Sequence, residues 1–129
     1  TNSFDGEFFT DHAVRSDGQL SPCRDISEVC QYYAFFTETA TPDLYPALWE
    51  TLVKHFGPDR KKTNAYPAVW HANSFIGNYL RLMLLERHGL KEQLLAEAVG
   101  YFLYMAEKTN TLWENDTSCN HGFASYVIQ

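Results

Sequence analysis

The sequence contains no uninterrupted apolar run long enough to cross a membrane, and no signal peptide opens it. Basic residues are also few, because 10 Lys and Arg stand against 16 Asp and Glu, giving a net charge of −6. A nucleic-acid partner requires a basic surface to meet its phosphates. We therefore expect neither a membrane nor a nucleic acid among the partners of this chain.

Cysteine is scarce as well. The three cysteines, Cys23, Cys30 and Cys119, are odd in number and form no C-x-x-C pair. Such spacing implies neither a zinc site nor a disulfide framework. On this basis we expect no metal and no cofactor.

Apolar and aromatic residues, by contrast, are abundant. Of the 129 residues, 45% are hydrophobic, 16% are aromatic and only 20% are charged, which is the composition of a globular domain with a real core. The many rings suit either a large aromatic core or a site that stacks sugar rings.

Apolar residues recur at helical spacing along most of the chain, which predicts a nearly all-α fold. The expected helices cover residues 26–37, 42–56, 73–87 and 90–107, and a fifth helix begins near residue 120. Asp25 with Glu28 has the spacing of a capping box, and Thr41-Pro42 is a strong start signal for the second helix. Residues 3–24 mix Gly, Pro and Phe and are expected to be irregular.

The expected helices are of two alternating kinds. Aromatic helices with little charge begin near residues 26, 73 and 120, so that each starts 47 residues after the one before. Paired helices that recur at such a period indicate an array of helical hairpins. The less charged helices would form a parallel inner layer, and six such hairpins would close a ring. This chain would hold two hairpins and the start of a third.

Each inner helix follows a polar or aromatic loop, namely residues 23–25, 70–72 and 113–121. Parallel hairpins would bring these three loops to the same rim. Indole rings stack on sugars, a carboxylate can activate water, and imidazole and guanidinium groups bind hydroxyls, so this rim favours a carbohydrate site. The candidate site residues are Arg24, Glu28, Trp70, His71, Trp113, Glu114 and His121.

Each candidate also has a purely structural interpretation. The tryptophans could be packing residues rather than sugar platforms, and His71 could simply close the loop before its helix. Glu28 could be a capping-box acid, and Arg24 could pair at the surface with a neighbouring carboxylate. Glu114 could be a solvated loop residue and His121 a helix cap.

A resemblance favours the functional interpretation. Thr111-Leu112-Trp113-Glu114, followed by Asn120-His121-Gly122 and Ala124-Ser125, resembles the end of the catalytic domain of the α-L-rhamnosidases. Residues 27–34 and 70–78 are similar to inner-helix segments of a bacterial branch of that family. The resemblance spans essentially the whole chain, and it implies the C-terminal part of a six-hairpin α/α-toroid glycosidase. Because the last apolar run stops without a cap, we expect a fragment of a longer parent protein.

The resemblance also implies roles for individual residues. Glu114 would be the general base of an inverting hydrolysis, His121 would contact the sugar in the −1 subsite, and Trp113 would lie beside the base. Inversion also requires a protonated carboxyl roughly 6.5–9.5 Å from the base, and the family places this acid upstream, outside this chain. The expected partners are a rhamnose-containing glycan or glycoside and the rest of the parent chain, and the isolated chain is expected to be inactive.

Two other classes of function stay open at this point. The chain could be a carbohydrate-binding helical module with no hydrolytic role, or an α-helical scaffold that presents a groove to another protein. The sequence does not determine the sugar, the linkage, the oligomeric state or the compartment, although the periplasm or cell exterior is favoured over the cytoplasm.

Overall fold

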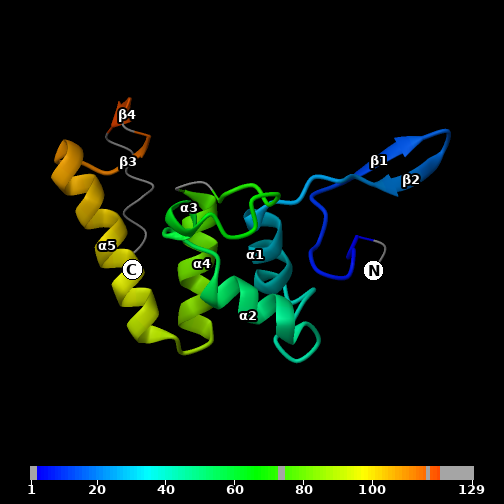
Figure 1. The fold of residues 1–129 in the computed structure, drawn as a ribbon, viewed down its shortest axis with the longest axis horizontal. Coiled ribbons are helices and arrows are strands. Elements are labelled where there is room, and N and C mark those ends of the chain that lie inside the picture. The colour runs from blue at the N-terminus through cyan, green and yellow to red at the C-terminus, as the bar shows by residue number, and fades with distance from the viewer. Residues whose placement is uncertain (1–2, 73–74, 116, 120–129) are drawn as a thin grey trace. The chain divides into compact units, whose positions relative to one another are not determined.

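The computed structural model describes residues 3–72, 75–115 and 117–119, with the backbone alone at 114, 115, 118 and 119. The chain divides into two compact units, Thr1–Ala72 and Asn73–Gln129, which we describe one at a time. The described residues are mostly helical and also form two small antiparallel hairpins (Figure 1). Among them, no helix combines the length and the apolar character that a membrane span requires.

The first unit contains a β-hairpin where the sequence led us to expect irregular chain. Strand β1 (Ala13–Ser16) pairs with β2 (Gln19–Pro22) across Asp17 and Gly18, whose φ angles are 49° and 80°. An Asp-Gly pair tolerates these positive angles and is typical of two-residue hairpin turns. Every residue of both strands is exposed, so the hairpin has no buried face that hydrophobic periodicity could reveal.

Helix α1 (Glu28–Phe36) begins with Ser27 as its cap. The Ser27 hydroxyl accepts a hydrogen bond from the Cys30 N–H at 3.2 Å, which satisfies one of the free donors of the first turn. The expected capping box of Asp25 and Glu28 is therefore wrong. Glu28 is the first residue of the helix, and its side chain is buried.

Helix α2 (Pro46–Lys54) begins four residues later than the Thr41-Pro42 signal predicts. Thr41 does receive bonds at a turn, because its hydroxyl and carbonyl oxygens accept from Leu44 N–H at 3.3 and 3.1 Å. The chain then restarts at Pro46, whose fixed φ and missing N–H suit the first helical position. The short helix α3 (Arg60–Thr63) follows.

Aromatic rings fill the core of the first unit. Phe8 stacks on Phe56 with ring centroids 6.0 Å apart, and Tyr66 meets Phe8 edge-on at 5.5 Å. Helices α1 and α2 meet through Phe35 and Trp49, whose centroids lie 5.2 Å apart. The buried apolar residues of this unit are Phe8, Phe9, Tyr32, Ala34, Phe35, Ala40, Leu48, Leu52, Phe56 and Val69.

The second unit contains the helical hairpin that the sequence predicts. Helix α4 (Ile76–Arg87) ends at a turn in which Gly89 has a φ of 71°. Gly89 N–H donates to the Glu86 carbonyl at 3.0 Å and Leu90 N–H to the Leu85 carbonyl at 2.8 Å, which is the Schellman pattern. Helix α5 (Lys91–Thr109) then returns along α4.

The seam between α4 and α5 has an apolar centre and one ion pair. Leu82, Leu85 and Ala98 are buried together, with Leu90, Leu94 and Phe102 packed against them. Arg81 on α4 binds the Glu97 carboxylate on α5 through two nitrogens, at 2.5 and 2.7 Å. This contact explains how an arginine that is 1% exposed is tolerated within the hairpin.

A second β-hairpin lies within the stretch that we predicted to be a polar loop. Strand β3 (Trp113–Asn115) pairs with β4 (Ser118–Cys119), with an irregularity between Trp113 and Asn115. The all-α prediction is therefore corrected to a mostly helical fold with two small hairpins. The expected fifth helix lies outside the described residues, and the toroid and the parallel inner helices stay predictions.

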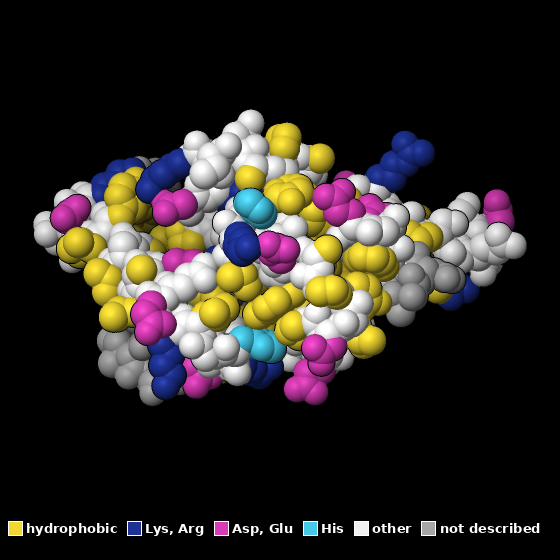
Figure 2. All heavy atoms as spheres, turned by 60° about the horizontal axis from the view of Figure 1, so that its bottom comes forward, with side chains coloured by type: hydrophobic (Ala, Val, Ile, Leu, Met, Phe, Trp, Pro, Cys, Tyr) yellow, Lys and Arg dark blue, Asp and Glu magenta, His cyan; other side chains and the backbone are white. Residues whose placement is uncertain are grey.

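Large apolar side chains remain exposed in both units. Figure 2 shows hydrophobic side chains reaching the surface between charged ones over much of one face. The exposed large apolar residues are Val14, Leu20, Tyr33, Leu44, Trp70, Ile76, Leu95, Val99, Leu103 and Tyr104.

Candidate functional site

A hollow of about 370 Å³ lies in the first unit where two distant segments meet. Trp70 N–H donates to the Ile26 carbonyl at 2.8 Å, and Glu28 N–H donates to the Trp70 carbonyl at 2.9 Å. This short parallel bridge joins the segment before α1 to residues 67–71. The structure thus brings together two of the three loops that we predicted to share a rim. The hollow is lined by Arg24, Asp25, Ile26, Pro67, Ala68, Val69, Trp70 and His71.

Glu28 does not line the hollow; it is 1% exposed and fully bonded to protein donors. One carboxylate oxygen accepts from Gly57 N–H at 2.7 Å and from the Tyr32 hydroxyl. The other accepts from Arg60 Nε at 3.0 Å and from Ala72 N–H at 3.2 Å. With both oxygens bonded in this way, the Glu28 carboxylate faces the protein interior and not the hollow.

Arg60 extends this network into the wall of the hollow. Its remaining nitrogens donate to the carbonyl oxygens of Ala65, Tyr66 and Val69 at 3.1, 3.0 and 2.9 Å. The guanidinium also lies over the Phe56 ring, 5.1 Å from its centroid. These three bonds tie Arg60 to residues 65–69, and residues 67–69 form one side of the hollow.

Trp70 combines a fixed backbone with an open ring. Its N–H and carbonyl are both bonded to the segment before α1, yet 69% of the residue is exposed. An indole that is held at its backbone and open to solvent suits stacking on a ligand. The packing interpretation that we left open for Trp70 does not describe this geometry.

His71 and Arg24 supply polar groups beside Trp70. Partial burial lowers the pKa of His71 below its ordinary value, and the positive charge of Arg60 lowers it further. A neutral imidazole can both donate and accept hydrogen bonds near neutral pH. Arg24 is exposed, and no salt bridge in the described part of the chain pairs it with Asp25 or Glu28.

Trp113, in the second unit, is buried, in contrast to Trp70. It is 9% exposed, and its ring meets Tyr104 edge-on with centroids 5.9 Å apart. The Lys108 ammonium lies over the Trp113 ring, 5.5 Å from its centroid. Its buried indole N–H has no hydrogen-bond partner among the described residues.

The candidate base and its imidazole partner are placed only in part. The backbone of Glu114 belongs to β3, whereas its side chain lies outside the described atoms. His121 lies outside the described residues. The convergence of residues 113–121 with the hollow of the first unit therefore stays a prediction.

Sequence reasoning did not identify Arg60 as part of the candidate site. Lys61 and Lys62 beside it are exposed, so the local sequence does not distinguish the buried arginine from its neighbours. The useful signal was Glu28, an acid in an aromatic helix, because a buried carboxylate requires a cation or several donors.

No protein-family model matches the chain, and the searches of curated proteins and of solved structures found no match either.

Proposed function

We propose that this chain is part of an inverting glycoside hydrolase of the α-L-rhamnosidase kind. In this proposal the hollow of the first unit binds a sugar, and Glu114 is the general base. The observation that carries the proposal is the exposed Trp70 ring at a hollow that also presents Arg24, Asp25 and His71. The motif resemblance at residues 111–114 and 120–122 supplies the reaction type.

The lining of the hollow has the chemistry that a sugar requires. The apolar face of a pyranose ring stacks on indole, while its hydroxyls need both donors and acceptors. Arg24 is a donor, Asp25 is an acceptor, and neutral His71 can be either. Because the Glu28–Arg60 pair holds the wall behind them, these groups are presented on a rigid support.

In the hydrolytic step, Glu114 would remove a proton from a water molecule that attacks the anomeric carbon opposite the leaving group. A protonated carboxyl from the rest of the parent protein would donate to the leaving oxygen. The net reaction inverts the anomeric configuration, and both carboxyls return to their starting states after proton exchange with water.

Sugar binding can be tested on the chain itself. Trp70→Ala should weaken the binding of L-rhamnose about tenfold, measured by calorimetry. Leu44→Ala is a matched control, since Leu44 is 71% exposed and lies outside the hollow. Equal affinity in the wild type and Trp70→Ala would remove Trp70 from the proposed site.

Catalysis is tested in the parent protein. Glu114→Gln should lower kcat about 10²–10⁴-fold on an aryl α-L-rhamnoside, because the proton acceptor is lost, while KM changes less. Glu107→Gln on α5 is an exposed control that should keep normal turnover. His121→Ala should weaken binding in the −1 subsite. The chain alone should show no cleavage above background, and near-normal turnover of the Glu114→Gln parent would contradict the assigned base.

A carbohydrate-binding module without hydrolysis is the second candidate. The features of the hollow favour it independently of Glu114, because they lie entirely within the first unit. Sugar binding that depends on Trp70, combined with a parent whose hydrolysis is unaffected by Glu114→Gln, would support this candidate over the enzyme.

A further inference from the structure

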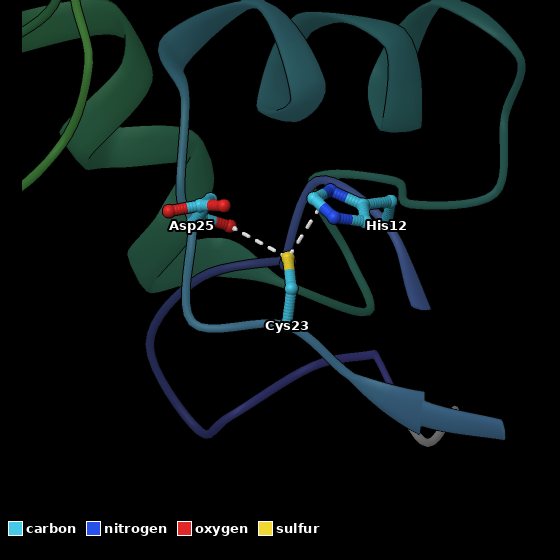
Figure 3. A group of neighbouring side chains, drawn as sticks. All are labelled: His12, Cys23 and Asp25. Atoms are coloured by element: carbon cyan, nitrogen blue, oxygen red, sulfur yellow. Dashed lines mark hydrogen bonds between the residues drawn. The ribbon is translucent and has the colours of Figure 1, made fainter. Parts of the chain in front are cut away.

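Three side chains with metal-binding atoms converge where the β1–β2 hairpin leads toward α1. The antiparallel pairing of β1 and β2 continues one step beyond Ala13 and Pro22, since Cys23 N–H donates to the His12 carbonyl at 2.9 Å. His12 and Cys23 are thus direct cross-strand neighbours, whose Cβ atoms lie close in an antiparallel pair. Asp25 follows two residues after Cys23. Figure 3 shows the Cys23 sulfur between His12 and Asp25.

The distances among these atoms fit one shared ion. Cys23 Sγ lies 3.3 Å from His12 Nδ1, and a ligand atom from each of the three residues lies within 4.8 Å of the other two. A tetrahedral zinc ion with Zn–S near 2.3 Å and Zn–N near 2.05 Å separates its sulfur and nitrogen ligands by about 3.6 Å. The sulfur and imidazole therefore need only a small adjustment to share a metal.

The backbone that carries the three ligands is held from both sides. Asp11 N–H donates to the Asp25 carbonyl at 2.9 Å, and Asp11 Oδ1 accepts from both Ser27 N–H and Ser27 Oγ at 2.8 Å. The Cys23 thiol also contacts the Asp25 carbonyl oxygen at 3.6 Å. These bonds tie the two ligand-bearing segments to the start of α1, so the cluster does not depend on the outer end of the hairpin.

We propose that His12, Cys23 and Asp25 form a binding site for a zinc-like divalent transition metal. A thiolate and a carboxylate would balance the two positive charges of the ion, and the neutral imidazole completes a sulfur, nitrogen and oxygen set typical of zinc. The sulfur ligand disfavours Mg²⁺ and Ca²⁺, which take oxygen ligands. Three protein ligands on an exposed edge leave a fourth position for water or a small molecule.

The metal site shares Asp25 with the proposed sugar site, but the evidence for it is the convergence of His12, Cys23 and Asp25 and does not rest on sugar binding. It also departs from the expectation of no metal, which rested on the absence of a C-x-x-C pair. Here His12 and Cys23 flank the two strands of a hairpin and lie 11 residues apart in sequence, so no short ligand spacing joins the imidazole to the thiol.

The test uses the reduced full-length chain and Co²⁺ as a spectroscopic substitute for zinc. We expect one equivalent of Co²⁺ to produce a thiolate-to-cobalt charge-transfer band and Zn²⁺ to abolish it by displacement. The band should remain in the Cys30→Ser/Cys119→Ser variant, in which Cys23 is the only thiol. Cys30 is a suitable residue to remove because its thiol already contacts the Thr10 carbonyl. Burial also raises the pKa of the Cys30 thiol to about 11, which disfavours the thiolate that binds a metal.

Variants of the three ligands complete the test. Cys23→Ser should abolish the band, and His12→Ala and Asp25→Asn should each weaken Zn²⁺ affinity by at least ~10-fold in calorimetry. Asp17→Asn at the hairpin turn is the control and should keep the wild-type affinity. Far-ultraviolet circular dichroism checks that each variant is folded. Absence of the band in the wild type, or binding that survives Cys23→Ser, would overturn the proposed site.

Discussion

At the scale of single residues, the buried pair of Glu28 and Arg60 organises the first unit. Glu28, at the start of α1, accepts bonds from Gly57 in the turn after α2, from Arg60 and from Ala72. Arg60 in turn donates to Val69, in the segment that forms one wall of the hollow. Removing one partner from such a pair leaves an uncompensated charge in a medium that cannot hydrate it. The pair therefore connects stability to the shape of the candidate site.

Replacing Arg60 tests this connection. Arg60→Met should lower the free energy of unfolding by about 3–5 kcal/mol, because Glu28 remains buried without its cation. The urea midpoint followed by circular dichroism measures the change. Lys61→Met, next to it but exposed, should alter stability by less than about 0.5 kcal/mol. Equal effects of the two substitutions would show that the Arg60 network contributes little to stability.

His71 provides a prediction about pH. Its pKa should lie below the ordinary value of about 6.5 in an NMR titration of the imidazole, through partial burial first and then the Arg60 charge. Because the folded state favours the neutral ring, the unfolded state binds more protons below that ordinary value. His71 therefore lowers the free energy of unfolding as the pH falls below about 6.5, and it has no such effect at higher pH.

Lys61→Met sharpens the same measurement. Lys61 is a further positive charge that lowers the pKa of His71, so its removal should move that pKa upward. Lys54→Met is the control, since Lys54 pairs with Glu50 and is not among the causes of the shift. A titration of His71 above the ordinary histidine value would contradict the described environment.

At the scale of elements, the ends of the helices depend on individual turn residues. Helix α4 ends where Gly89 adopts a left-handed conformation, whereas Gly100 lies inside α5 with helical geometry. Among the described residues, and apart from the glycine's own chain neighbours and helix backbone, a Cβ at either glycine would meet no atom within 4 Å. Substitution at these two positions therefore isolates the backbone preference from packing.

The two glycines should respond to alanine in opposite directions. Gly89→Ala should destabilise the second unit by about 1 kcal/mol, because an L-residue resists the positive φ. Gly100→Ala should stabilise it by roughly 0.5–1 kcal/mol, because alanine has the higher helix propensity. Thermal or urea unfolding of both variants against the wild type gives the comparison, and a stabilising Gly89→Ala would contradict the assigned helix end.

At the scale of the whole molecule, large apolar side chains are exposed in both units. On α5, Leu95, Val99 and Leu103 are each more than half exposed and recur every four residues, so they share one face of the helix. Such a stripe on a helix surface is typical of a face that packs against other protein. It is also the feature that most favours the alternative of an interaction scaffold.

This surface predicts self-association of the isolated chain. Light scattering at rising concentration should show oligomers, and the double variant Leu95→Glu/Leu103→Glu should shift the chain toward monomer. Glu92→Lys on α5 changes charge without removing apolar surface, so it should leave the oligomers in place. A monomeric wild-type chain at high concentration would count against an uncovered toroid face.

Local sequence signals predicted the elements that depend on neighbouring residues. Helical periodicity identified α1, α2, α4 and α5. The expected helix end at residue 87 agrees with the end of α4 at Arg87, which is followed by the Schellman turn with Gly89 at positive φ. The β1–β2 hairpin escaped notice because its exposed strands have no alternation of burial. The start of α2 was misplaced because two successive positions, Thr41-Pro42 and Pro46, have the chemistry of a helix start.

The candidate site depended on contacts between residues far apart in the chain. The sequence suggested that Arg24, Trp70 and His71 belong together, but only the tertiary structure showed that Trp70 is exposed and that Trp113 is buried. It also decided that Glu28 is held by Arg60. The physical reason is that hydrophobic periodicity and turn preference act within a few residues, whereas burial and charge pairing depend on which distant segments meet.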